Sequence, residues 1–67
     1  MVNYDKLRGA LAEKKITQGE IAERLGCTRQ SVGNKLTGKT PLTVKDVTII
    51  SDMLDISLAD RDAIFFA

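Results

Sequence analysis

Histidine is absent from this 67-residue sequence, and cysteine occurs only once, at Cys27. Without histidine, a His-based catalytic triad, a His metal site and a His proton shuttle are all excluded. A single cysteine can form no internal disulfide, and we expect Cys27 to behave as a small hydrophobe. None of the nine acidic residues has a spacing that pairs it with a nucleophile or a metal. The sequence therefore predicts neither an enzyme nor a cofactor.

Long apolar runs are also missing. No stretch approaches the ~20 residues that a membrane-spanning helix needs, and no apolar block near the first residue resembles a secretory signal. Hydrophobic residues nevertheless make up 43% of the chain, a globular value that argues against disorder. We expect one small domain over residues 1–67, with no membrane association.

Charge is unevenly placed along the chain, although the net charge is only +1. Residues 1–40 contain eight lysines and arginines against four acids, whereas residues 41–67 contain two basic and five acidic residues. This polarity suggests an anionic partner for the first part of the chain. Chance is the alternative, since imbalances of this size are common in small domains.

The first half of the chain has the spacing and capping patterns of helices. Asn3 can cap a first helix that runs to about Lys15. Thr17 and Glu20 fit a capping box at the start of a second helix, which ends at Gly26, a residue that favours a left-handed stop.

A third helix over residues 29–36 follows Thr28 as its cap and ends before Gly38. Capping patterns then recur at Thr43 and at Ser57, each with an aspartate three residues later, and each starts a further helix. No strand-like alternation is present. The sequence predicts five helices and an all-α fold.

The predicted third helix has two different sides. Val32 and Leu36, four residues apart, face the core. At ~100° per residue, the opposite side carries polar residues, and a long arginine at the helix start can project forward. These outward residues are Arg29, Gln30, Ser31 and Asn34. A glycine at position 33 costs about 1 kcal/mol relative to alanine, so it either admits a close neighbour or is simply tolerated.

The second and third helices are joined by the short segment "GCT", which is the arrangement of a helix-turn-helix. An exposed helix fits the major groove of DNA, which is about 12 Å wide. Arg29, Gln30 and Asn34 would then meet base edges. The alternative is an ordinary solvated helix face, since outer faces of helices are usually polar.

The stretch "TQGEIAERLGCTRQSVGNKLTGK" resembles the phage Cro/cI repressor type of helix-turn-helix. The matching positions are Gln18, Ala22, Gly26, Val32 and Gly38. Downstream, "LTVKDVTIISDMLDIS" is similar to the fourth helix of that family, and "RDAIFFA" resembles the ends of short Cro-like proteins from phages and prophages of Gram-positive bacteria. The resemblance implies a compact five-helix, lambda-repressor-like domain.

The resemblance also implies roles for individual residues. Arg29, Gln30 and Asn34 would read bases, and Gln18 would contact phosphate at the start of the second helix. Further contacts with the sugar-phosphate backbone would come from Lys35, Thr37, Lys39 and Thr40. Either lysine could instead be a plain surface residue, and Gln18 could be an ordinary first-turn residue.

We therefore expect a Cro-like repressor in the bacterial cytoplasm that binds double-stranded operator DNA, as a homodimer and without a small-molecule ligand. Of the adjacent rings Phe65 and Phe66, one would fill the core and the other could form the dimer contact. The main alternative is a protein-binding adaptor or antirepressor that reuses the same fold. An antitoxin is a third possibility, but it usually needs an extra segment to grip its toxin.

Overall fold

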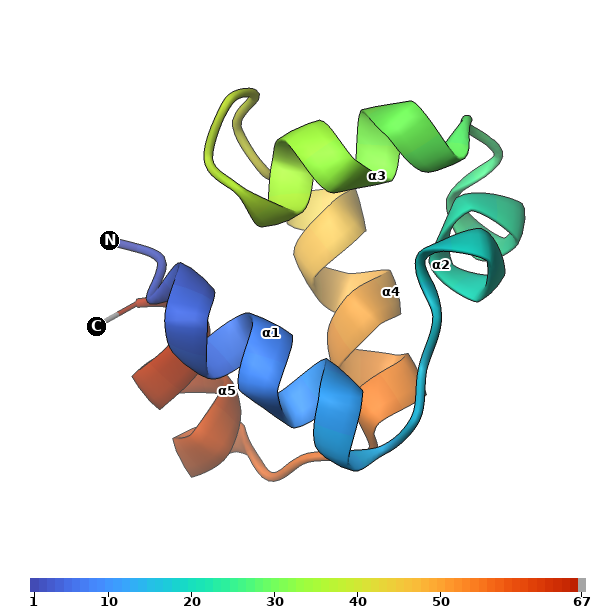
Figure 1. Cartoon of the computed structure of the whole chain (residues 1–67). Coiled ribbons are helices and arrows are strands. Elements are labelled where there is room, and N and C mark those ends of the chain that lie inside the picture. Colours follow the sequence, from blue (N-terminus) through green and yellow to red (C-terminus); the bar gives the residue numbers. More distant parts are fainter. Residues whose placement is uncertain (67) are drawn as a thin grey trace.

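Helices account for most of the computed structural model, which describes residues 1–66 (Figure 1). Its elements are α1 (Tyr4–Glu13), α2 (Gln18–Leu25), α3 (Arg29–Leu36), α4 (Val44–Leu54) and α5 (Leu58–Phe65). No strand is found over this described range, and the predicted all-α class is confirmed. The first helix is shorter than predicted, because the chain turns after its cap at Lys14 and Lys15 takes a left-handed conformation with φ 57°.

Each helix begins after a side chain that accepts a hydrogen bond from the backbone N–H three residues later; these caps are Asn3, Thr17, Thr28, Thr43 and Ser57. Such caps contribute about 1 kcal/mol each. Thr43 and Asp46 form a full capping box. The box predicted at Thr17 is only half formed, because the carboxylate of Glu20 accepts from the hydroxyl of Thr17 (3.2 Å) instead of from its backbone N–H.

The core draws on all five helices. Its buried apolar residues are Leu7, Leu11, Ile21, Ala22, Val32, Leu36, Ile50, Leu54, Ile64 and Phe65. Val32 and Leu36 face inward as predicted. Phe65 lies in the core whereas Phe66 is 62% exposed, so the two rings separate as their angular spacing requires. Cys27 is half-buried and packs against this core, in keeping with its expected role as a small hydrophobe.

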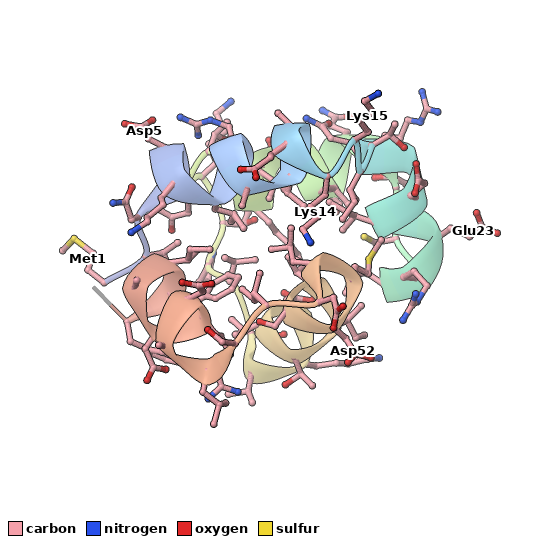
Figure 2. All side chains as sticks on the ribbon, turned by 90° about the horizontal axis from the view of Figure 1, so that it is seen from below. Met1, Asp5, Lys14, Lys15, Glu23 and Asp52 are labelled. Atoms are coloured by element: carbon pink, nitrogen blue, oxygen red, sulfur yellow. The ribbon has the colours of Figure 1, made fainter. Side chains whose placement is uncertain are left out.

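The arrangement leaves one side of α3 uncovered. In Figure 1, α4 passes through the middle of the molecule, with α1 and α5 on one side, and α3 lies across the top. Residues 1–3 reach the end of α5, where the N–H of Asn3 donates to the carbonyl of Ile64 (2.7 Å). Seen from below, Lys15 in the turn after α1 and Glu23 of α2 point outward (Figure 2). The turn between α4 and α5 is at the opposite end of the molecule from α3 (Figure 1).

Candidate nucleic-acid interface

The turn between α2 and α3 fixes how the two helices meet. Gly26 has φ 73°, a left-handed conformation that suits glycine because any other residue would be strained there. The carbonyl of Ala22 accepts from the N–H groups of both Gly26 (2.8 Å) and Cys27 (3.0 Å), so the last turn of α2 is closed by the turn itself. The predicted helix-turn-helix geometry is therefore present.

The outer side of α3 carries the three residues that were predicted to read bases. Arg29 and Gln30 are exposed, and Asn34 is half-buried. Within residues 1–66, no hydrogen bond or salt bridge engages the side chain of any of the three. Their donors and acceptors are thus available to a ligand, while Val32 and Leu36 hold the opposite side of the helix in the core.

Arg29 lies back over α2 rather than projecting forward from the helix start. A Cβ atom built on Gly19 would come within 2.7 Å of Nη2 and 2.9 Å of Nε of this arginine. At the same crossing, Oε1 of Gln18 lies 3.4 Å from the Cβ position of Gly33. Each helix therefore contributes one glycine and one long polar side chain, and each side chain passes over the glycine of the other helix. The Gln18 oxygen lies at an ordinary van der Waals separation from the Cβ position of Gly33, so this neighbour does not require a glycine there.

The C-terminal end of α3 is tied to α1 by an arginine that sequence reasoning did not single out. Arg8 donates from Nη1 to the carbonyl of Leu36 (2.8 Å) and from Nη2 to Oδ1 of Asp5 (2.6 Å). Asp5 and Arg8 are three residues apart on α1, a spacing at which opposite charges commonly pair. That spacing could have indicated the ion pair, but nothing local indicated the bond to Leu36.

Lys35 is also engaged inside the domain. Its Nζ lies 2.6 Å from Oδ2 of Asp46, and the two side chains are only 21% and 6% exposed. Burial would raise the pKa of the Asp46 carboxyl, but hydrogen bonds from Lys35 and from the N–H and hydroxyl of Thr43, together with the charge of Lys35, lower that pKa below its ordinary value. The same carboxylate completes the cap of α4, so this pair joins α3 to α4.

Of the other residues expected near phosphate, three follow the end of α3 and one begins α2. The hydroxyl of Thr37 donates to the carbonyls of Gly33 (2.9 Å) and Asn34 (3.3 Å). Lys39 and Thr40 donate their backbone N–H groups to the carbonyl of Asn34 (2.9 and 3.2 Å).

The side chains of Lys39 and Thr40 are exposed, as is that of Gln18 at the start of α2. Gly38, with φ 84°, turns the chain after α3, and the ring of Tyr4 lies against it: a Cβ built there would be 3.1 Å from Cε2. The loop after α3 is thus held by its own backbone while the side chains expected to meet phosphate remain outside.

The surface assembled in this way offers hydrogen-bond donors and positive charge around an exposed helix. Phosphate oxygens and base edges are the partners that such groups bind. No set of three His, Cys, Asp or Glu residues within the described chain is arranged to hold a metal ion. Over residues 1–66, no helix is both long and apolar enough to cross a membrane.

Comparison with known proteins gives one match. A family model described as "Helix-turn-helix" matches residues 7–60, from the first turn of α1 into α5. No curated protein and no solved structure matches the chain. The matched range includes the crossing of α2 and α3, the turn at Gly26 and the ion pair between Lys35 and Asp46.

Proposed function

The chain belongs to the Cro/cI-type helix-turn-helix family of DNA-binding regulators, with a lambda-repressor-like all-α fold, and from this we propose that it is a Cro-like phage or prophage repressor. It would place α3 in the major groove of an operator and exclude polymerase or a competing repressor. One observation carries the proposal: the core side of α3 is buried, while the polar side chains on its outer side have no partner within residues 1–66.

The residue types on α3 suggest which bases they meet. The guanidinium of Arg29 suits the O6 and N7 edge of guanine, and the amides of Gln30 and Asn34 suit adenine. Gln18, Lys39 and the exposed loop after α3 would contact phosphate and set the register of the helix on the duplex.

Two of the residues expected near phosphate would have to change partners to do so. Lys35 would leave its ion pair with Asp46, so we assign it a weaker share of phosphate binding than Lys39. Thr37 donates its hydroxyl proton inside α3, and a phosphate would have to replace the carbonyl of Gly33 as its acceptor. The hydroxyl of Thr40 makes no hydrogen bond within residues 1–66 and is exposed, so we assign it to phosphate together with Lys39.

The proposed repressor binds as a homodimer, because one small reading head contacts few bases. Its half-sites would lie about one DNA turn (~34 Å) or a multiple apart. We place the contact between copies at the apolar cleft beside the start of α4, where Val44 is 85% and Phe66 is 62% exposed. Phe66→Ser should shift the sedimentation coefficient toward that of a monomer. If the unaltered protein sediments as a monomer both alone and on DNA, the dimer is excluded.

The experiment that tests the function is selection from a random duplex pool at ~0.1–0.2 M salt, where non-specific binding is weak. Enrichment of a two-fold repeat supports a dimeric operator-binding repressor and measures its half-site spacing. Enrichment of a single half-site supports sequence reading by a monomer. Absence of any enriched sequence overturns the proposal and favours the protein-binding adaptor.

A further inference from the structure

We propose that Gly19 is a positioning residue for DNA recognition: its missing side chain lets the guanidinium of Arg29 rest over the first turn of α2, which fixes the direction from which Arg29 meets DNA. This inference rests on the proposed function of α3 as the reading helix. It concerns a residue of α2 that would itself contact no base.

The contact at Gly19 is closer than any side chain there would allow. A Cβ at this position would be 2.7 Å from Nη2, 2.9 Å from Nε and 3.1 Å from Cζ of Arg29. Separations under 3.0 Å force something to move, and the atoms concerned are the far end of a flexible side chain, with no backbone atom among them. Alanine at position 19 would therefore displace the guanidinium and leave the packing of α2 on α3 in place.

The second glycine of the crossing behaves differently. A Cβ on Gly33 would lie 3.4 Å from Oε1 of Gln18, which is an ordinary van der Waals separation. Alanine fits at position 33 without moving Gln18. Of the two glycines, only Gly19 is required by the side chain that passes over it.

Placing Arg29 before DNA arrives has a physical consequence for affinity. A free arginine samples many rotamers, and confining it on binding opposes association. When α2 already limits those rotamers, less freedom is lost on binding. We expect loss of this contact to weaken binding to the specific site about two- to tenfold, and to leave binding to random DNA unchanged.

The test compares three glycine-to-alanine variants of the full chain. Gly19→Ala is the test variant, and Gly33→Ala is a control for folding at the same crossing, because Gly33 lies on the proposed reading helix itself. Gly9→Ala is the control for helix propensity, because Gly9 lies within α1 with nothing within 4 Å of its Cβ position. All three should melt at or above the temperature of the unaltered protein, since alanine favours helix over glycine. Of Gly19→Ala and Gly9→Ala, only Gly19→Ala should lose specific affinity; equal affinities for these two variants overturn the inference.

A cycle with Arg29→Ala shows whether Gly19 acts through Arg29. In the Arg29→Ala background, Gly19→Ala should cause no further loss of specific affinity. If Gly19→Ala weakens binding equally in both backgrounds, it acts on the DNA directly and the inference fails.

The placement of Arg29 has its own readout in the free protein. The NMR resonance of the Arg29 Nε–H group should move in Gly19→Ala and stay in place in Gly9→Ala. If the resonance does not move in Gly19→Ala, the inference about Gly19 fails, while the proposed function is unaffected. Failure of the unaltered protein to select any DNA sequence overturns the proposed function, whatever this resonance does.

Discussion

The two ends of α3 carry basic residues that are held in different ways. At the N-terminal end, Arg29 is exposed and rests on Gly19 without a hydrogen bond to residues 1–66. At the C-terminal end, Lys35 forms an ion pair with Asp46, and Arg8 reaches from α1 to the carbonyl of Leu36. The two cations of this eight-residue helix therefore differ: Arg29 is available to a partner, whereas Lys35, like Arg8 from α1, stabilises the domain.

The helix dipole gives this difference an electrostatic basis. Cations near a helix C-terminus are stabilising, as Lys35 and Arg8 are here, whereas a cation at the N-terminus opposes the dipole. Among the described helices, α1, α2, α4 and α5 have an acid in the first turn, while α3 has none and begins with Arg29. An anion bound at this end would supply the missing negative charge. Arg29 therefore destabilises the start of α3 slightly, and a phosphate bound there, as the proposed function requires, would offset this cost.

A charge on the buried side of α3 should unfold the domain and so disrupt the contacts at both ends of the helix. Val32→Asp buries an unpaired carboxylate where Val32 is only 1% exposed, and we expect the free energy of unfolding to fall by more than about 4 kcal/mol. A loss of that size unfolds many small domains. Circular dichroism during heating measures it. Gln30→Asp adds the same charge to the outer side of α3 and should stay folded; unfolding of both variants would contradict the assigned faces.

Asp46→Ala should lower the free energy of unfolding by removing the ion pair at the C-terminal end of α3, without changing its N-terminal end. It removes half of a capping box and leaves Lys35 half-buried without its partner, at a cost of about 1–3 kcal/mol. Denaturant unfolding measures the loss, with Asp52→Ala on the exposed part of α4 as the control.

The same pair predicts a pH dependence. Because folding lowers the pKa of the Asp46 carboxyl, its stabilisation is complete above the unfolded value near 3.8 and is lost as the pH falls through the lower folded value. Unfolding measured at pH 7 and in acid should therefore show a smaller acid loss for Asp46→Ala than for the unaltered protein. An equal acid loss in both proteins would mean that Asp46 does not carry this dependence.

Arg29→Ala should affect the N-terminal end alone. We expect a loss of about 1–3 kcal/mol in binding to the selected site, with little change in binding to random DNA and no loss of stability. Fluorescence anisotropy titrations on the two duplexes measure both affinities. Equal weakening on the two duplexes would show that Arg29 contacts phosphate and does not read a base.

Lys39→Ala should have the smallest effect, below about 1 kcal/mol, and weaken specific and random binding alike. Its clearer signature is the salt dependence, because each phosphate contact contributes about 0.9 to the slope of log affinity against log salt. Lys35→Met is the matched comparison: it should lower stability, because Lys35 pairs with Asp46, and reduce that slope less than Lys39→Ala does. An equal fall of the slope in both variants would mean that the two lysines contribute equally to phosphate binding.

Features that depend on local sequence were predictable. Helix caps, the glycine stop at Gly26 and the inward spacing of Val32 and Leu36 involve residues within a few positions of one another, so their pattern can be read directly. The bounds of α3 followed from Thr28 and Gly38 for the same reason.

The contacts that distinguish the two ends of α3 were not predictable. Arg8 and Leu36 are 28 positions apart, and Lys35 and Asp46 are 11 apart, so each bond depends on how whole helices pack. In the sequence, Lys35 and Lys39 are equivalent basic residues close to the end of one helix. Only the position of α4 against α3 gives one of them a buried partner.

The bond between Asn3 and Ile64 brings the beginning of α1 beside the end of α5, so the first and last described residues leave the molecule together (Figure 1). A short linker could therefore join them, with new ends opened in the turn between α4 and α5. That turn lies at the far end of the molecule from α3 (Figure 1), and cutting it interrupts none of the five helices. A circular permutant of this kind would carry any fused label well away from α3, the proposed reading helix (Figure 1).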